Sequence, residues 1–163
     1  MKHLLFISLL VSITPAAGWD DKEQAKGKET GHEVHSGYFE KNNSGLKGDV
    51  SFLTITDQKS FDKTFGAAAT MKKQNFLPKD AFDSRMVVAT IKRGTSIAEY
   101  KVDKVTIDEG AVYIQYESKS KDGGGTAKFA SSLVVSLDKG KYTSVVFIEN
   151  GKKVETLKIE KDK

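Results

Sequence analysis

The sequence contains no cysteine, which excludes several kinds of chemistry together. Disulfide bonds, thiol nucleophiles, thiolate metal sites and dithiol redox reactions all depend on cysteine side chains. A domain of this chain therefore depends on its hydrophobic core for stability. No motif points to a cofactor, and we expect none.

Histidine is scarce as well, and the positions of the three residues matter more than their number. His3 is near the N-terminus, His32 and His35 lie in a charged stretch, and residues 36–163 contain none. Histidine is the usual general base near neutral pH. If the charged stretch lies outside the fold, the domain lacks Ser-His and His-metal sites. We therefore predict that the chain is not an enzyme, while carboxylate or lysine chemistry of an unknown class stays open as an alternative.

Arginine is the third scarcity, because only Arg85 and Arg93 stand among the 26 basic residues. The lysines account for the formal net charge of +4. The arginine guanidinium suits bidentate recognition of phosphates and bases, whereas lysine is a strongly hydrated point charge. We expect no nucleic-acid partner and interpret the lysines as a solvated surface. A lysine-rich surface module that binds anionic envelope polymers is the alternative.

Long apolar runs are missing except near the N-terminus, where residues 4–13 read LLFISLLVSI. Lys2 precedes this run, and Pro15 to Gly18 supply small residues after it. This three-part pattern is typical of a secretory signal peptide, and the run is too short to span a bilayer. We predict that residues 1–18 are a signal peptide and that the protein is exported to a periplasm or the extracellular space. We expect no membrane span.

Residues 19–35, WDDKEQAKGKETGHEVH, are almost entirely polar and show no apolar periodicity. This composition predicts a flexible charged tail, followed by a single β-rich domain over residues 36–160. Within the tail, His32 and His35 could chelate Zn²⁺ or Cu²⁺ with one further ligand. Their spacing is not that of the helical H-E-x-x-H motif, so we favour no metal site.

Two-residue alternation dominates the remaining chain and predicts a mainly β fold, either an antiparallel β-sandwich or a strongly curved sheet. One short helix is expected near residues 58–65, with Asp57 as its N-cap and Gly66 at its C-terminus. A further helical turn is expected before Pro78.

Residues 50–55 should form a strand, and the nearly continuous apolar stretch 86–91 should form a central strand covered on both faces. Later alternate apolar residues should point inward together: Phe129, Leu133, Val135 and Leu137. Residues 108–110 should form a three-residue hairpin loop, and Asn150-Gly151 is the preferred pair for a type I′ turn. The register expected from that turn pairs Glu149 with Lys152 and Phe147 with Val154.

The stretch SKSKDGGGTAK, residues 118–128, places three consecutive glycines among lysines. A phosphate-binding loop needs the G-x-x-x-x-G-K-[ST] spacing before a helix, and a dinucleotide site needs a βαβ unit. Here strand-like alternation resumes at Phe129 instead. We therefore predict a connection between two strands. The neighbouring carboxylates of the chain are interpreted as solvated surface: Asp80 with Asp83, Asp108 with Glu109, and Glu99 with Asp103.

The order of several motifs resembles a known family. Ser36-Gly37 and Ser44-Gly45 precede a strand, and the next helix carries a D-x-x-x-F pattern at Asp57 and Phe61. Phe82-Asp83 then leads into Met86-Val87-Val88-Ala89. Over residues 36–150 this order is similar to the C-terminal domain of PrcB-type proteins, accessory subunits of secreted bacterial protease complexes. The resemblance implies a non-catalytic β domain that contacts a protease subunit.

One loop departs from that family. Its members commonly carry G-x-x-P-T-G-G-Y after the M-V-V-A strand, whereas residues 94–100 here read GTSIAEY, without the proline and the paired glycines.

Together these observations predict an exported, non-catalytic β domain that acts by protein–protein contact, as an accessory to a protease complex if the resemblance holds. Loops and exposed strand edges are the usual means of such contact. The loop after Ile91 and the glycine-rich loop are the candidate contact segments. The predicted partner-binding residues are Gly94, Thr95, Tyr100, Gly123, Gly124 and Gly125.

Overall fold

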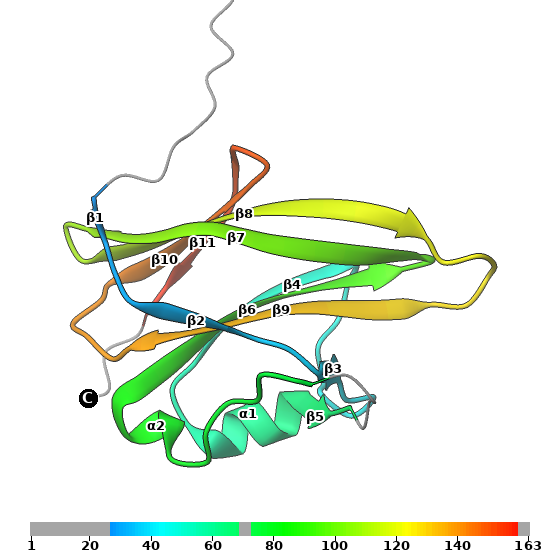
Figure 1. The fold of residues 1–163 in the computed structure, drawn as a ribbon, viewed down its shortest axis with the longest axis horizontal. Helices are drawn as coiled ribbons and strands as arrows, with labels where there is room; N and C mark the ends of the chain where they lie inside the picture. The colour runs from blue at the N-terminus through cyan, green and yellow to red at the C-terminus, as the bar shows by residue number, and fades with distance from the viewer. Residues whose placement is uncertain (1–26, 69–72, 160–163) are drawn as a thin grey trace, which may run out of the picture.

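The computed structural model describes residues 27–68 and 73–159 of the chain. Its strands form two packed sheets, with a small ribbon and two short helices on the outer face of the second sheet (Figure 1). This β-sandwich-like arrangement confirms the mainly β fold predicted from the alternation. Within these two ranges no helix is long and apolar enough to cross a membrane. The predicted signal peptide, residues 1–18, lies outside them.

The larger sheet has five strands in the order β1-β7-β8-β10-β11. They are β1 (Lys28–Glu29), β7 (Ser96–Asp108), β8 (Ala111–Asp122), β10 (Ser144–Glu149) and β11 (Lys152–Lys158). Neighbours are antiparallel except β8 and β10, which run parallel. Parallel neighbours need a crossover connection, and here the chain passes through the other sheet between them. Alternation alone carries no information about strand direction, so this pair was not predicted.

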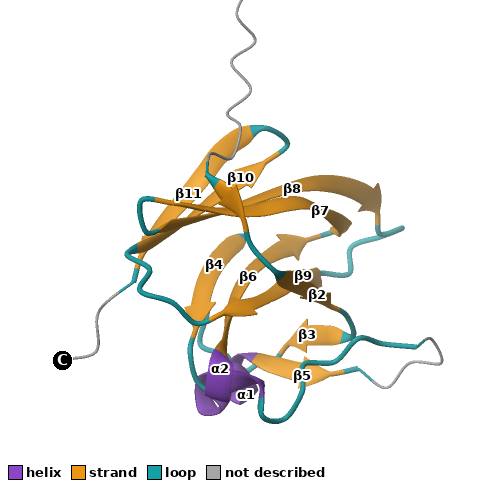
Figure 2. Ribbon diagram, turned by 60° about the vertical axis from the view of Figure 1, so that its left-hand side comes forward, coloured by secondary structure: helices purple, strands orange, loops and turns teal. Residues whose placement is uncertain are grey.

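The smaller sheet has four antiparallel strands in the order β2-β9-β6-β4. They are β2 (His32–His35), β9 (Phe129–Asp138), β6 (Arg85–Gly94) and β4 (Val50–Ile55). Its outer face carries four short elements (Figure 2): α1 (Gln58–Thr64), α2 (Ala81–Ser84), β3 (Tyr38–Glu40) and β5 (Phe65–Ala67). The strand predicted over residues 50–55 is confirmed.

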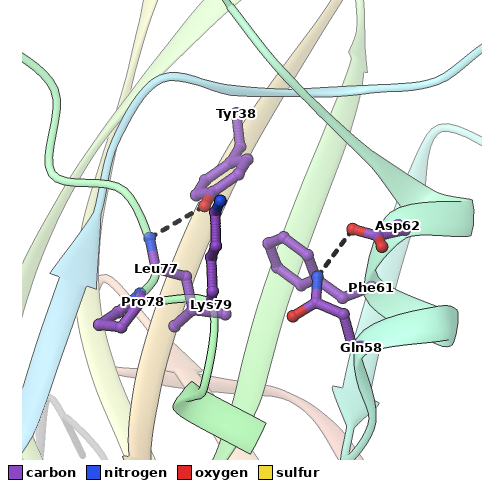
Figure 3. Close-up of a pocket in the computed structure, with 7 residues that line it drawn as sticks. All are labelled: Tyr38, Gln58, Phe61, Asp62, Leu77, Pro78 and Lys79. Atoms are coloured by element: carbon purple, nitrogen blue, oxygen red, sulfur yellow. Dashed lines mark hydrogen bonds between the residues drawn. The ribbon is translucent and has the colours of Figure 1, made fainter.

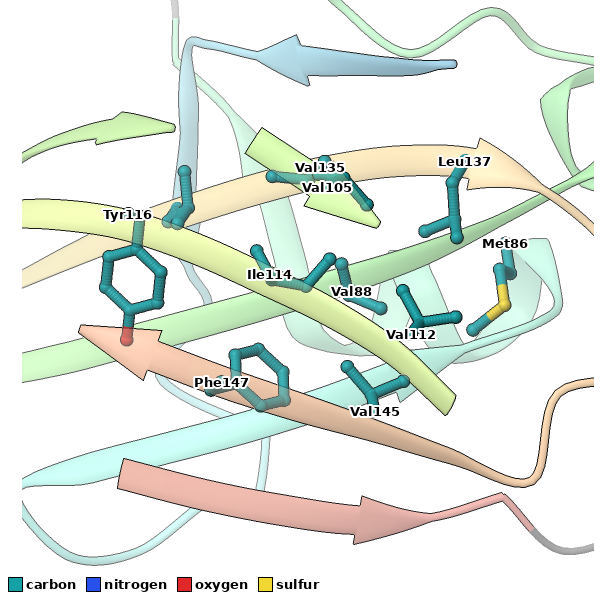
Figure 4. Close-up of a cluster of buried hydrophobic side chains, with 11 residues drawn as sticks. Met86, Val88, Val105, Val112, Ile114, Tyr116, Val135, Leu137, Val145 and Phe147 are labelled. Atoms are coloured by element: carbon teal, nitrogen blue, oxygen red, sulfur yellow. The ribbon is translucent and has the colours of Figure 1, made fainter. Parts of the chain in front are cut away.

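The main core lies between the two sheets, where alternate side chains of their strands point toward one another (Figure 4). Its buried members are Met86, Val88, Val105, Val112, Ile114, Tyr116, Leu133, Val135, Leu137, Val145 and Phe147. Of the β9 residues predicted to point inward, all are in this list except Phe129, which is half-buried. Burial of one such side chain contributes about 1.5–3 kcal/mol, so this core can stabilise a domain without disulfides.

A second core lies on the other face of the smaller sheet. There Val87, Ala89 and Ile91 of β6 pack with the aromatic side chains of the helical layer, among them Phe61 and Phe82. Strand β6 therefore contributes side chains to both cores. This confirms the central strand predicted from its continuous apolar sequence.

The prediction of a flexible tail up to residue 35 is wrong for residues 28–35. β1 pairs with β7, and β2 pairs with β9 over its whole length. Both are edge strands with polar side chains toward solvent, which is why their sequence shows no apolar run. His35 is 4% exposed, so the folded domain begins before residue 36.

The Asn150-Gly151 turn forms as predicted, with φ angles of 51° and 76°. Glu149 pairs with Lys152, but the predicted pairing of Phe147 with Val154 is wrong. A β-bulge between Phe147 and Ile148 shifts the register, so that Phe147 lies opposite Glu155. Such a bulge adds one residue to a strand and leaves no local signature in the sequence.

The other predicted hairpin has a shorter loop than expected. Asp108 pairs with Ala111, so only Glu109 and Gly110 lie in the loop. Their φ angles of 48° and 82° are those of a type I′ turn. The predicted three-residue loop at 108–110 is therefore wrong by one residue.

Helix α1 begins as predicted, because the Asp57 carboxylate accepts a 2.9 Å hydrogen bond from the Ser60 N–H. Gly66 does not end the helix in a left-handed conformation; it lies in β5 opposite Phe39. A Cβ atom on Gly66 would lie 2.5 Å from Cζ of Phe39, so the glycine makes room for that ring. The helical turn predicted before Pro78 is absent from residues 73–77, and α2 forms after the proline instead.

Candidate functional site

Two loops predicted to contact a partner meet at one end of the sandwich (Figure 1). Gly94 is the last residue of β6, and the loop after β8 begins at Gly123. A Cβ atom on Gly123 would lie 2.3 Å from the carbonyl oxygen of Thr95, so the two backbones are in contact. We call this surface, residues 94–97 and 122–129, the loop end.

The three glycines of the loop end have different structural roles. Gly123 also faces Phe129, whose Cε2 would lie 2.3 Å from an added Cβ. Gly124 has a φ of +75°, and its N–H donates a 3.0 Å hydrogen bond to Oδ1 of Asp122. Gly125 has open space around it. The stretch connects β8 to β9, as predicted, and its path is fixed by the first two glycines.

Tyr100, one of the predicted partner-binding residues, lies in β7 outside the loop end. Its ring packs 6.0 Å from the ring of Tyr116, and its hydroxyl donates a 3.3 Å hydrogen bond to the Ser131 carbonyl. Burial raises the pKa of Tyr100 above its ordinary value, and the Glu149 charge acts in the same direction. Tyr100 therefore joins β7 to β9 and stabilises the sandwich.

A groove of about 300 Å³ lies beside the loop end. The end of β6, the start of β9 and the loop after β3 form its walls. Its lining residues are Glu40, Lys41, Asn42, Ser44, Leu46, Arg93, Lys128, Phe129 and Ala130. Three cations and one carboxylate therefore border a groove that also contains an aromatic ring.

Arg93 and Glu40 form a bidentate ion pair in the wall of this groove. Arg93 Nε lies 2.7 Å from Oε2 and Nη2 lies 2.8 Å from Oε1 of Glu40. Arg93 also donates to the Gly48 carbonyl at 2.9 Å and to the Ser51 hydroxyl at 3.0 Å. The hydrogen bonds from Arg93 hold the pKa of Glu40 below its ordinary value, although burial opposes them. This pair closes the loop between β3 and β4, while Lys128 stands exposed at the rim.

A second groove, of about 330 Å³, lies between α1 and the segment that precedes α2 (Figure 3). The ring of Tyr38 meets the ring of Phe61 edge to face at 5.0 Å, and its hydroxyl accepts a 2.9 Å hydrogen bond from the Leu77 N–H. Burial raises the pKa of Tyr38. On the facing helix, Gln58 and Asp62 are hydrogen-bonded to each other at 2.8 Å. Sequence reasoning missed this groove because its residues come from separate segments and form no motif.

His35 lies inside the fold, so the premise that the domain contains no histidine is wrong. Its Nδ1 lies 3.2 Å from the Asn75 carbonyl oxygen, and its Nε2 lies 2.8 Å from the Ser136 hydroxyl. A carbonyl can only accept, so Nδ1 carries the proton and Nε2 accepts from Ser136. Ser136 is 0% exposed and His35 is 4% exposed, so no substrate can reach this Ser-His pair. Burial lowers the pKa of His35, and the pair fastens β2 to β9.

The histidines considered as metal ligands are separated by the strand geometry. His32 and His35 are three residues apart in β2, and side chains at that spacing point to opposite faces. In residues 27–68 and 73–159 no three histidine, aspartate or glutamate side chains gather in a way that could hold a metal ion. Of the predicted surface carboxylates, Glu99 pairs with Lys121 at 2.6 Å and Asp103 pairs with Lys101 at 3.4 Å.

A polar cluster also crosses the main core. Lys92 Nζ donates to the Glu149 carboxylate and lies 3.2 Å from the Ser118 hydroxyl. The Tyr116 hydroxyl donates a 3.2 Å hydrogen bond to Glu149, and burial raises the pKa of Tyr116. The cluster links β6 of one sheet to β8 and β10 of the other.

Comparisons of the chain with protein-family models, curated proteins and solved structures find no match. The resemblance to PrcB-type proteins therefore stays a prediction from the motifs of the sequence. The function has to be inferred from the surfaces that the fold presents.

Proposed function

We propose that this protein is an exported, non-catalytic β domain that acts by contact with another protein through the loop end. The observation that carries the proposal is the meeting of the β6–β7 turn and the β8–β9 loop, beside a groove of about 300 Å³. Loops held on a rigid scaffold are a common place for binding surfaces. A subunit of a protease complex is the partner that the sequence resemblance suggests.

The loop end offers an apolar contact, close backbone approach and positive charge. Ile97 is 39% exposed and can serve as an apolar anchor. The exposed backbone at Gly124 and Gly125 has no side chain to keep a partner away. Lys128 is exposed on the same surface, and Lys121, next to it at the end of β8, is exposed as well. The complementary partner surface is an apolar pocket with an acidic rim.

The buried ionisable groups support binding over catalysis, because each one fastens strands together. Glu40 is bound by Arg93, Glu149 is bound by Lys92, and His35 is bound by Ser136. In each of the three contacts, the buried base is bound by another side chain of the protein. None of these three bases therefore faces a groove without a partner. A catalytic acid or base needs such a free position next to its substrate.

Affinity capture with crosslinking from the native cell envelope tests this proposal. The wild-type protein should retain a specific protein, with crosslinks at Lys121 and Lys128. Ile97→Asp should lose that protein. Val154→Asp is the matched control, because Val154 is 42% exposed and lies on β11, away from the loop end. The proposal is wrong if the wild-type protein retains nothing above a denatured bait, or if both variants retain the same proteins.

A further inference from the structure

One side of the sandwich is covered along only part of its length. Strand β1 pairs with the end of β7, at Thr106 and Ile107, and the Thr30 N–H donates a 3.0 Å hydrogen bond to the Val105 carbonyl. The chain then crosses to the smaller sheet, where it forms β2 (Figure 1). In the ranges that the structure describes, no strand pairs with this side of β7 over residues 96–104. This stretch of β7 is therefore an open sheet edge.

The backbone groups of alternate β7 residues point out of this open edge. The Ala98 N–H donates a 2.9 Å hydrogen bond to the Ser131 hydroxyl of β9, so it is not bonded to β8. Opposite Tyr100, the backbone of β8 is bonded to the Asn150 side chain, on the other side of that strand. Opposed residues of antiparallel strands alternate between bonded and non-bonded pairs. The N–H and C=O groups of Tyr100 and Val102 therefore point outward, as those of Ala98 do.

The side chains behind this edge agree with an uncovered strand. Val105, beside the crossover from β1, is 1% exposed, whereas Val102 and Tyr100 are half-buried although both pack against the main core. A β-bulge at Asp103 ends the regular part of the edge, since bulges interrupt strand pairing. The uncovered residues 96–104 have Tyr100 at their centre. A second copy of this stretch therefore has the length to pair antiparallel with it, between the crossover and the loop end.

The charges on this edge match a second copy of the same strand. Glu99 and Lys101 are exposed on either side of Tyr100. Because Tyr100 faces the core, both charged side chains point to the outer face of the larger sheet. When two copies of β7 pair antiparallel about Tyr100, Glu99 of each copy lies opposite Lys101 of the other. Opposite charges in such cross-strand positions stabilise a pair of strands.

The neighbouring registers are unfavourable, which makes this pairing specific. A shift of two residues in one direction places Glu99 opposite Glu99 of the other copy. The same shift in the other direction places Lys101 opposite Lys101, and like charges directly opposite each other are destabilising. A shift of one residue would oppose core-facing and solvent-facing side chains. Among these registers, only the one centred on Tyr100 therefore pairs opposite charges.

We propose that the protein forms a two-fold symmetric dimer in which the open edges of β7 pair antiparallel about Tyr100. The N–H and C=O of Tyr100 bond to those of Tyr100 in the other copy, and the Val102 N–H donates to the Ala98 carbonyl of the other copy. The same patch of each copy forms the interface, as two-fold symmetry requires. The larger sheets of both copies become one continuous sheet. This association of the protein with itself goes beyond the contact proposed at the loop end.

Analytical ultracentrifugation of the purified full-length protein, from about 1 μM to about 1 mM, tests this proposal. Salt at about 0.15 M screens the net charge of +4 on each copy. We expect a concentration-dependent equilibrium between monomer and dimer. The Tyr100 and Val102 amides should exchange with solvent more slowly as the dimer forms, whereas the Glu99 and Lys101 amides, which point to β8, should be protected throughout. A monomer at about 1 mM, or a dimer with unchanged Tyr100 and Val102 exchange, would overturn the proposal.

Charge reversal tests the register. Glu99→Lys and Lys101→Glu each place like charges opposite one another, so each variant alone should raise the dimer dissociation constant at least about tenfold. Mixed in equal amounts, the two variants should dimerise with each other, because every charge pair across the edge is then opposite. Glu155→Lys and Lys158→Glu, on β11 at the other edge of the sheet, are the matched controls and should dimerise like the wild type.

These variants should keep the fold, because the pair of Glu99 with Lys121 is exposed and contributes little to stability. Wild-type dimerisation of Glu99→Lys, or a mixture of the two variants that does not associate, would contradict the register. The measurement needs no other protein. Its failure would therefore leave the affinity capture at the loop end unaffected, and a failed capture would leave the dimer in place.

Discussion

His35 and Ser136 share a hydrogen bond of 2.8 Å across the contact between β2 and β9. The segment that carries Asn75 reinforces this contact from the other side. The Asn75 carbonyl accepts a hydrogen bond from the His35 ring at 3.2 Å, and the Asn75 side-chain amide donates one to the Val34 carbonyl at 2.8 Å. Strand β2 lies at the edge of its sheet, with β9 as its neighbour. These polar bonds hold β2 in place, as a second neighbouring strand would hold a central strand.

Because burial lowers the pKa of His35, stability should depend on pH near the ordinary histidine value of about 6.5. A base with a depressed pKa in the fold is protonated more readily in the unfolded chain. The contribution of His35 is therefore fully present above about pH 6.5 and is lost as the pH falls toward the folded pKa. Urea denaturation at about pH 7.5 and pH 5 should show lower stability at the acidic pH.

The neighbouring charges act on His35 in both directions, since Glu33 raises its pKa and Arg85 lowers it. Those two side chains are themselves paired at 2.7 Å. His35→Gln removes the titration while keeping an amide that can hydrogen-bond, so the loss of stability between the two pH values should shrink. His32→Gln, on the opposite face of β2, is the control and should keep the wild-type pH dependence. An unchanged pH dependence in His35→Gln would contradict the assignment.

The Arg93–Glu40 pair should contribute more to stability than an exposed pair. Their side chains are 19% and 9% exposed, so Arg93→Met leaves a mostly buried carboxylate without its partner. We expect a loss of about 2 kcal/mol in the free energy of unfolding. Lys121→Met is the matched control, because Lys121 and Glu99 are 66% and 55% exposed. That change should cost less than about 1 kcal/mol.

The double variant Arg93→Met with Glu40→Met separates the pair from its packing. Removing both charges should recover part of the stability that Arg93→Met loses, because no unpaired carboxylate remains. Equal stability of Arg93→Met and Lys121→Met in urea denaturation would show that the Arg93–Glu40 pair does not stabilise the loop between β3 and β4 as proposed.

The glycine-rich loop should tolerate substitution at one glycine and resist it at another. Gly123→Ala brings a Cβ within 2.3 Å of the Thr95 carbonyl, a backbone atom that cannot turn away. We expect it to lose about 1–3 kcal/mol. Gly125→Ala has open space and should stay within about 0.5 kcal/mol of the wild type. Thermal and urea denaturation of the two variants measure the difference, and equal stability would mean that the loop end is not closely packed.

Local chemistry in the sequence was enough to predict several elements. Alternation predicted the β fold, Asp57 predicted the start of α1, and Asn150-Gly151 predicted a type I′ turn. The continuous apolar sequence of β6 predicted a strand with two covered faces. Each of these predictions depends on residues within a few positions of one another, and propensities and turn preferences act at that range.

Contacts between distant residues were decided only by the tertiary structure. Residues 32–35 of the charged stretch form an ordered edge strand because β9 offers them backbone partners and Ser136, 101 residues away, binds His35. The parallel pairing of β8 with β10 and the bulge after Phe147 follow from how the two sheets pack. The loop end is a further contact between distant residues. The sequence indicated Gly94 and Gly123 as separate candidates, and the packing of the sheets brought their loops together. Hydrophobic alternation determines which face of a strand is buried, whereas the neighbour of each strand depends on the fit of the whole sandwich.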